Sequence, residues 1–303
     1  MTTAFAGCAL SVGHHAKNAA AAYCSARRHP AWGADRGPGV NCQIVQESQV
    51  GNRRSNEDRV GHWSTGSAVL MAVADGVGGY PHGDLAAEGA LQTLSELFLR
   101  EARPDLPMPG EFFGSVFLEA NRRLLAQARR WRLPKNHCTT LVACVVQKGQ
   151  LWWAHCGDSR LYLVRSGEIV VRTRDHSLSE RRDSPSVKVR VPAGASQHML
   201  VSCLGSTRRP MVDCAGPWSL ADGDRLLLCS DGLWGPLTEP ALLHCMCRDD
   251  MPSAVRALVQ DALTSAQPFS DNVTALGCLY QSSPDAVADT VPAAARDLAP
   301  GRG

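Results

Sequence analysis

Acidic residues stand beside several apolar, strand-like segments of this sequence. Asp75 and Asp231 end such segments, Asp271 comes just before one, and Asp158 lies between two. A further acidic pair, Glu57-Asp58, follows residues 51–56. Carboxylates that a fold brings close together repel one another, and hard divalent cations such as Mg²⁺ or Mn²⁺ neutralise them through oxygen ligands. Two such cations can lower the pKa of a shared water and orient it for attack on phosphorus. Gly76 follows Asp75, and the missing side chain would let its carbonyl approach a metal.

The plainer interpretation of these motifs is that each is a turn. Asp75-Gly76 and Asp231-Gly232 are Asp-Gly pairs, which are common in loops, and one such pair alone would be read as a turn. Acidic sites recurring in order along the chain favour the metal interpretation, because a random sequence rarely produces that series.

Short apolar segments joined by turn residues predict the strands that would hold these acids. We expect strands at Ala68–Ala74, 140–147, 150–155, 161–165, 168–172, 224–230 and 272–280, and helices at 83–100, 111–130, 238–247 and 252–266. Lys148-Gly149 and Ser166-Gly167 read as hairpin turns. Hairpins imply antiparallel pairing, and helices in separate blocks imply an α+β fold. We therefore expect two antiparallel sheets packed face to face as a sandwich, with helices outside.

The two ends of the chain differ from the middle in amino-acid composition and hydrophobic periodicity. Residues 1–40 are rich in Ala, Gly, His and Arg without a sustained period, which predicts a flexible arm or an extension upstream of the true start. Residues 41–281 read as one globular domain, and residues 282–303 as a disordered tail. The first residues lack the basic region of a signal peptide, and Ala6-Gly7-Cys8 only faintly resembles a lipoprotein cleavage site.

The composition of the chain argues against several classes of binding partner and metal site. A net charge of +2 gives no general reason to expect nucleic acid or an anionic membrane, and no apolar run is long enough to span a bilayer. The 12 cysteines include no CxxC pair, which argues against a zinc site. Reduced thiols in a cytoplasmic protein are favoured over a disulfide framework. Cys156, beside the Asp158 motif, is read as a packing residue, with a reactive thiol as the alternative.

The motifs, taken in order, resemble the PP2C family of metal-dependent protein phosphatases in its bacterial form. The resemblance covers residues 41–281. It rests on Arg53-Arg54-Ser55-Asn56-Glu57-Asp58, Val73-Ala74-Asp75-Gly76-Val77-Gly78-Gly79, Thr139-Thr140-Leu141, Gly157-Asp158-Ser159-Arg160, Asp175-His176-Ser177, Leu204-Gly205, Ser230-Asp231-Gly232-Leu233 and Asp271-Asn272. Each motif is weak alone, whereas the ordered series is specific.

The resemblance implies a role for each acidic residue. Asp75 would bridge two cations, Mn²⁺ or Mg²⁺, and the other expected ligands are Glu57 and the Gly76 carbonyl at one cation, and Asp231 and Asp271 at the other. Asp158 with Asp231 would hold a third, weaker cation, and Asp58 would hold metal-bound water. Arg53 matches the arginine that grips the substrate phosphate, for which a guanidinium fork is suited. The family fold is a β-sandwich flanked by helices, and its reaction is direct attack by water.

The chain departs from the family pattern at several positions near these motifs. Val77 stands where some eukaryotic relatives have a histidine thought to act as general acid, and Tyr80 where many bacterial members have histidine. His82 could donate a proton to the leaving oxygen, the alternative being a solvated loop histidine. Cys138 replaces the usual glycine before the Thr-Thr pair, which we read as a packing adjustment, and His176 is read as a structural loop residue.

We expect an active phosphatase of phosphoserine and phosphothreonine that opposes a bacterial Ser/Thr protein kinase. Its partners would be phosphorylated proteins, including that kinase and its substrates, and we expect a cytoplasmic monomer. The alternatives are a catalytically weak or inactive binding module that retains the fold, and a regulator with one narrow target. Loss of a metal aspartate would mark the inactive class, and none is lost here.

Overall fold

The computed structural model describes residues 40–78, 82–133, 137–182 and 199–282. The predicted arm (1–40) and tail (282–303) therefore lie outside the described residues, apart from one residue each. Ten strands form two five-stranded sheets within the described part, and all strand pairs are antiparallel. None of the helices described there is long and apolar enough to cross a bilayer.

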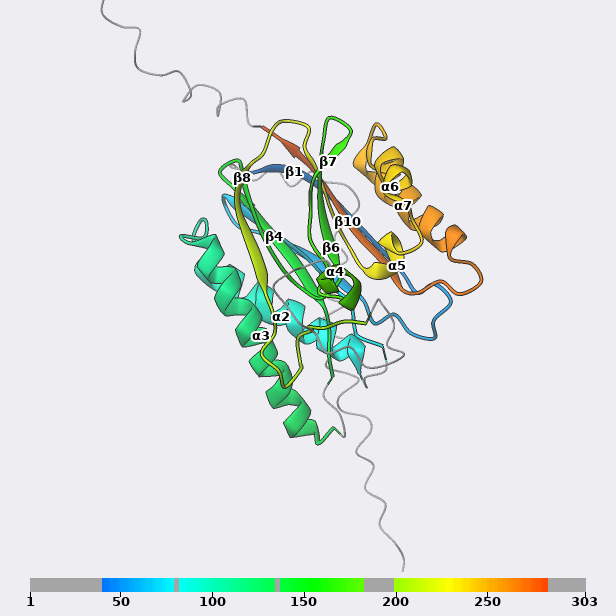
Figure 1. The fold of residues 1–303 in the computed structure, drawn as a ribbon. Helices are drawn as coiled ribbons and strands as arrows, with labels where there is room; N and C mark the ends of the chain where they lie inside the picture. Colours follow the sequence, from blue (N-terminus) through cyan, green and yellow to red (C-terminus); the bar gives the residue numbers. More distant parts are fainter. Residues whose placement is uncertain (1–39, 79–81, 134–136, 183–198, 283–303) are drawn as a thin grey trace, which may run out of the picture. The chain divides into compact units, whose positions relative to one another are not determined.

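One sheet has the order β1-β10-β9-β6-β7 and the other β2-β3-β4-β5-β8. The first contains β1 (Asn41–Gln49), β10 (Val273–Gln281), β9 (Arg225–Cys229), β6 (Arg160–Arg165) and β7 (Glu168–Arg172). The second contains β2 (Arg59–Ser64), β3 (Ala68–Ala74), β4 (Leu141–Gln147), β5 (Gln150–Cys156) and β8 (Asp213–Ser219). The predicted α+β fold with two antiparallel sheets is confirmed (Figure 1).

Strand β3 shows why the sandwich holds together. All seven of its residues are buried, and they alternate between two cores. Leu70 and Ala72 pack with the helices α2 (Gly83–Glu101) and α3 (Pro109–Trp131), whereas Met71 and Val73 pack against the other sheet. A strand buried on both faces needs apolar residues at every position, which explains the continuous apolar run.

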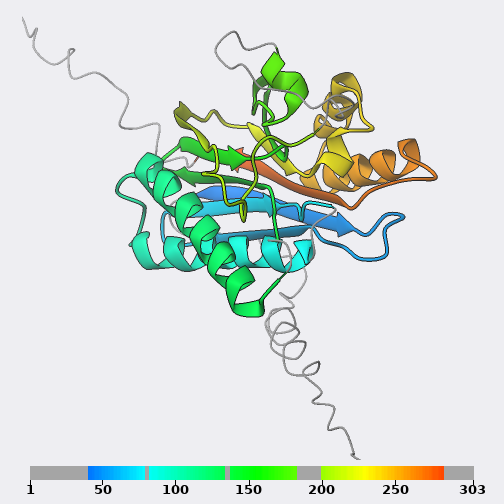
Figure 2. The same ribbon diagram turned by 60° about the horizontal axis from the view of Figure 1, so that its bottom comes forward.

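A second helical layer covers the outer face of the other sheet. It consists of α6 (Glu239–Met246) and α7 (Met251–Ser265), and Figure 2 shows it on the side of the sandwich opposite α2 and α3. Helix α7 sits close on β10, where a Cβ at Gly277 would lie 2.6 Å from Met251 Sδ and from Val255 Cγ2. Two short helices, α4 (Leu178–Arg182) and α5 (Asp231–Trp234), follow β7 and β9.

The structure contains strands that the apolar pattern missed. Strands β1, β2 and β8 were not predicted, and each is the edge strand of its sheet. Edge strands bury little of their surface and so need no apolar run; every residue of β8 is exposed, and it contains Gly216-Pro217. The other strands and the four predicted helices agree with the expectation to within two residues at most ends.

Candidate metal centre and active site

The strand ends converge at one end of the sandwich and bring the acidic residues together. Asp75 follows β3, Asp231 begins α5 just after β9, and Asp271 lies two residues before β10. Because Cys229 of β9 pairs with both Ala275 of β10 and Arg160 of β6, the chain segments carrying Asp231, Asp271 and Asp158 are neighbours.

A cleft of about 770 Å³ opens at this end. Its lining in the described part of the chain includes Arg53, Glu57, Asp75, Asp158, Asp231 and Asp271. The predicted set is thus brought into one site, with Asp58 buried beside it at 3% exposure.

Asp75 is the centre of the acidic cluster. Its carboxyl group interacts with Asp58, Asp158 and Asp231, and it shares a hydrogen bond with Asp231. Burial is the largest cause of a pKa well above the ordinary value, and the neighbouring negative charges add to it. Burial and the charge of Asp271 likewise raise the pKa of Asp231, against the contact with Asp75, which lowers it.

The other acids are perturbed in the same direction. Burial, followed by the charge of Asp231, raises the pKa of Asp158 to about 8. Burial likewise raises the pKa of Asp58 to about 6, against hydrogen bonds that lower it. Burial and Asp84 raise the pKa of Glu57. Arg53 and Arg160 act on these acids, yet burial and mutual repulsion still raise the carboxyl pKa values. Divalent cations with oxygen ligands would supply the further positive charge.

The surroundings of the two carboxylate oxygens of Asp58 also support a bound cation. Ser230 Oγ donates to Asp58 Oδ2 at 2.8 Å, and the Thr274 amide donates to Ser230 Oγ at 3.1 Å. Asp58 Oδ1 is buried and has no hydrogen-bond partner among the described residues. A buried carboxylate oxygen without a partner is costly unless a water or an ion occupies the space before it, so the residues present fit a bound metal.

The backbone around Asp75 is fixed by the two threonines of the Thr-Thr motif. Thr139 Oγ1 and the Thr140 amide both donate to the Asp75 carbonyl at 2.8 Å, and the Asp75 amide donates to Thr140 Oγ1 at 3.1 Å. Next to it, a Cβ on Gly76 would lie 2.5 Å from the carbonyl carbon of Gly83. Glycine is therefore required at position 76 because the first turn of α2 packs directly on this backbone.

Arg53 and the loop that carries it are tied to the start of β10. Arg53 is exposed, and its Nη2 lies 2.5 Å from Asp271 Oδ2. Asn272 Oδ1 accepts a hydrogen bond from the Glu57 amide at 2.9 Å, while Asn272 Nδ2 donates to the Val50 and Ser55 carbonyls. Sequence reasoning gave Asn272 no role of its own, although the Asp271-Asn272 pair was recognised as a motif.

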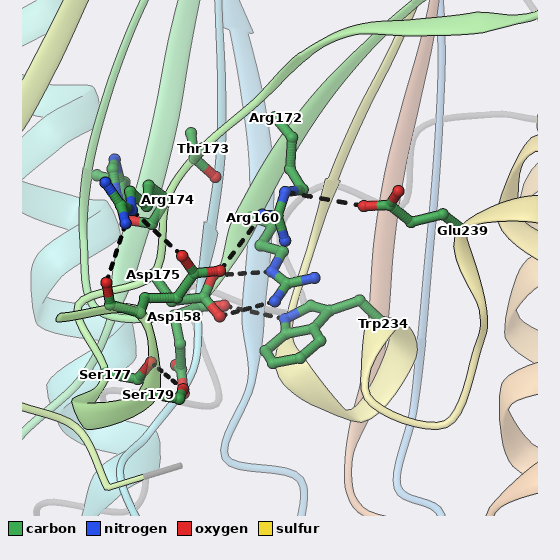
Figure 3. A network of polar contacts seen from close by, with 12 residues as sticks. Asp158, Arg160, Arg172, Thr173, Arg174, Asp175, Ser177, Ser179, Trp234 and Glu239 are labelled. Atoms are coloured by element: carbon green, nitrogen blue, oxygen red, sulfur yellow. Dashed lines mark hydrogen bonds and ion pairs between the residues drawn. The ribbon is translucent and has the colours of Figure 1, made fainter. Parts of the chain in front are cut away.

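A buried network holds Asp158 in place (Figure 3). Trp234 Nε1 donates to the Asp158 carbonyl at 2.9 Å, and the guanidinium of Arg160 lies 3.4 Å from the centre of the Trp234 ring. Arg160 binds Asp175 through two hydrogen bonds of 2.8 and 2.7 Å. Gly157 adopts φ 111°, in the left-handed half of the map, and turns the chain so that Asp158 enters the cleft. The roles of Trp234 and Arg160 were missed by the sequence reasoning.

The histidines have different surroundings. His82 is exposed, precedes α2 with φ 59°, and is not among the described residues that line the cleft, so its role as general acid stays a prediction. His176 is buried; its Nδ1 accepts from the Gly157 amide at 3.2 Å, and its Nε2 is 3.2 Å from an Asp213 oxygen. Since Nδ1 accepts, a neutral His176 carries its proton on Nε2, which faces Asp213 and has no lone pair for a metal. His155 stacks on it at 4.5 Å.

Comparisons with known sequences find a protein family and relatives that match this chain. A family model described as protein phosphatase 2C matches residues 45–265. The serine/threonine phosphatase Stp of Listeria welshimeri is 30% identical over 235 residues, which are 74% of this chain and 90% of that protein. The phosphatase PstP of Mycobacterium tuberculosis is 29% identical over 228 residues, 73% of this chain. The chain spans 41% of the length of PstP.

Solved structures give the same result. The catalytic domain of PstP in complex with two manganese ions superposes with a TM-score of 0.64 at 27% identity, covering 80% of this chain and 99% of that one. The phosphatase MsPP of Mycobacterium smegmatis, in complex with cacodylate, has a TM-score of 0.65 at 27% identity, covering 81% of this chain and 100% of that one.

Proposed function

This chain belongs to the protein phosphatase 2C family, and from that membership we propose that it hydrolyses phosphoserine and phosphothreonine esters of proteins with two divalent cations bound in the acidic cleft. The observation that carries the proposal is the cluster of buried carboxyl groups around Asp75, in which burial and mutual repulsion raise the carboxyl pKa values. Mn²⁺ or Mg²⁺ bound there would supply an activated water and neutralise the phosphoryl oxygens.

The ligand roles that we propose are those that the family resemblance implies. Asp75 interacts with Asp58, Asp158 and Asp231, which supports its role as the residue that would bridge the two cations. Glu57 and the Gly76 carbonyl would complete one site, and Asp231 with Asp271 the other. Asp158 with Asp231 would hold a third, weaker cation.

Two further residues would handle the water and the phosphate. Asp58, with Oδ2 held by Ser230, presents Oδ1 as an acceptor that would orient the attacking water. Arg53 now pairs with Asp271, and a cation bound to Asp271 would compete for that carboxylate and leave the guanidinium to grip the substrate phosphate. His82 remains our candidate for protonating the leaving oxygen.

We also infer the setting in which the enzyme acts. A phosphatase of protein esters reverses the product of a protein kinase, so its partners would be a Ser/Thr kinase and the substrates of that kinase. The ten cysteines in the described part of the chain are all unpaired, which supports a reducing, cytoplasmic compartment. We expect the protein to act as a monomer.

The test is hydrolysis of p-nitrophenyl phosphate and of a phosphothreonine peptide by the purified chain. We expect turnover with Mn²⁺ or Mg²⁺ that EDTA abolishes. Asp231→Asn should lower kcat by more than about a hundredfold, because one carboxylate ligand is lost. Asp249→Asn, which changes an exposed acid outside the cleft, is the matched control and should leave kcat unchanged.

Two results would refute the proposal. Near-normal kcat in Asp231→Asn would show that this carboxylate is not a ligand. Absence of turnover on both substrates with excess Mn²⁺, together with calorimetry that detects Mn²⁺ binding, would instead indicate an inactive binding module.

A further inference from the structure

Three cysteines lie close together at one wall of the acidic cleft. Cys203 lines the cleft and is partly exposed, whereas Cys138 and Cys156 are each 1% exposed behind it. The sequence reasoning read Cys138 and Cys156 as packing residues and assigned nothing to Cys203. The structure therefore places one accessible thiol in front of two inaccessible ones.

The backbone aligns Cys138 with Cys203. Thr139 and Leu204 form an isolated antiparallel bridge, in which each amide donates to the other's carbonyl, at 3.1 and 2.9 Å. Side chains alternate across such a pairing, so the residues before Thr139 and before Leu204 project to the same face as diagonal neighbours. The two thiols are near enough there for each to shift the pKa of the other.

Cys156 has a different partner. Its Sγ lies 3.3 Å from the Ser202 hydroxyl, which also accepts a hydrogen bond from the Met211 amide at 2.9 Å. The thiol that contacts Cys203 directly is therefore that of Cys138.

Charge is distributed unequally over the two sulfurs. The interaction with Cys138 is the largest cause of a lowered pKa at Cys203, and the same interaction raises the pKa of Cys138. The thiolate therefore forms first on the member that solvent reaches, while the buried member keeps its proton. A low-pKa accessible thiol beside a second thiol is the arrangement of an attacking and a resolving cysteine.

We propose that Cys138 and Cys203 form a peroxide-sensitive dithiol that closes to a reversible disulfide at the wall of the acidic cleft. The Cys203 thiolate attacks one oxygen of hydrogen peroxide, the O–O bond breaks, and hydroxide leaves, which oxidises Cys203 to a sulfenic acid. The Cys138 sulfur then attacks the Cys203 sulfur, the S–O bond breaks, and the Cys138 proton leaves with that oxygen as water. Two thiols and one peroxide thus become one disulfide and two waters.

Closure has a consequence for catalysis, which rests on the proposed phosphatase function. A disulfide brings the sulfurs to about 2.05 Å, well inside hydrogen-bond separation, so the bridge segments must shift. The segment after Cys138 cannot yield freely, because Thr139 and Thr140 hold the Asp75 carbonyl. On the other side, a Cβ at Gly205 would lie within van der Waals overlap of the His137 carbonyl, which shows how tightly the two segments pack. We therefore expect oxidation to displace Asp75 and to stop turnover.

The test treats the full-length protein with stepwise hydrogen peroxide in EDTA, alkylates the remaining thiols, and maps the tryptic peptides without reduction. Trypsin should release residues 136–148, which contain Cys138 and Cys144, and residues 191–208, which contain only Cys203. We expect these two peptides to be linked through Cys138. The mass of the linked species should be lower by two hydrogens than the sum of the two peptide masses, and dithiothreitol should separate the peptides.

The variants assign the two roles. Cys138→Ser should leave Cys203 as a sulfenic acid that dimedone traps, and Cys203→Ser should leave Cys138 reduced, because solvent does not reach it. Cys214→Ser removes an exposed thiol on β8 and is the matched control, with linkage and basal turnover unchanged. A link from Cys203 to Cys156, or free Cys138 and Cys203 at a peroxide dose that oxidises Cys214, would overturn the proposal.

Turnover of p-nitrophenyl phosphate with Mn²⁺ is then measured on the same samples. It should fall in step with the linked fraction and return with dithiothreitol. Full turnover in the linked protein would overturn the catalytic consequence. Untreated protein without turnover would instead mean failure of the proposed function, and it would leave the peptide result intact.

Discussion

The raised pKa of Asp158 predicts how the stability of the metal-free protein depends on pH. The folded carboxyl group titrates at about 8, against an ordinary value of 3.8. Between these values the folded state binds a proton that the unfolded state has lost, so the free energy of unfolding falls as pH rises. His137 and His155 have lowered pKa values and act in the opposite direction, but only below the ordinary histidine value of 6.5.

Above about pH 6.5 these histidines no longer oppose the trend, and up to about pH 8 a carboxyl group that stays protonated only in the folded state contributes about 1.4 kcal/mol per pH unit; Asp75, whose pKa is also raised, acts in the same direction. Asp158 alone should lower the free energy of unfolding by about 1.5 to 2 kcal/mol across this window, which lowers Tm by about 3 to 8 °C for a domain of this size. Asp158→Asn keeps the size of the side chain and removes the titration. Metal-free Asp158→Asn should accordingly show a dependence that is flatter by the Asp158 share, with the share of Asp75 left in place.

Thermal unfolding followed by circular dichroism in EDTA measures this directly. Glu168→Gln, which changes an exposed acid in the β6–β7 hairpin, is the control and should keep the wild-type slope. Saturating Mn²⁺ should reverse the wild-type trend, because a cation competes with the protons and gains affinity as pH rises. A wild-type Tm that stays constant or rises across the window without metal would refute the reasoning, as would equal slopes in wild type and Asp158→Asn.

Three other substitutions test separate parts of the structure. Arg53→Ala should mainly raise KM, since the guanidinium grips the phosphate in the ground state and the transition state alike, and an unchanged KM in steady-state assays would remove that role. Gly277→Ala should destabilise the fold by about 1 to 3 kcal/mol in urea titrations, because the added methyl overlaps Val255 of α7; an unaltered midpoint would contradict that packing. Asp250→Ala removes the side chain that caps α7 through the Ser253 amide at 2.7 Å and should cost about 1 kcal/mol, read from the same titration.

The acids of the site could be predicted from the sequence because their signal is local. Each lies beside an apolar run, and the antiparallel pairing of β9 with β10 puts the end of one strand beside the start of the next, so Asp231 and Asp271 were brought together, with Asp75, as expected. Strand β3 was predicted within its observed bounds, since its burial on both faces leaves an uninterrupted apolar run.

The residues that support those acids could not be predicted in the same way. Ser230 holds Asp58 from 172 positions away, and Asn272 holds the Glu57 amide from 215 positions away. No periodicity in a single sequence encodes such a contact. The role of Trp234 could not be predicted either, because an aromatic residue after an Asp-Gly motif is expected to be a core residue. Only the fold shows that its indole donates a hydrogen bond to the Asp158 carbonyl.

The contact between Gly76 and Gly83 limits what mutation can do to this protein. A side chain at Gly83 would overlap a carboxylate oxygen of Glu57, just as one at Gly76 would overlap the backbone of Gly83. The first turn of α2 therefore packs directly on the loop that carries Asp75 and Gly76, and no side chain fits between them. Gly83, which does not contact substrate, is thus as restricted in residue type as a metal ligand, whereas the exposed surface of α2 can accept substitutions.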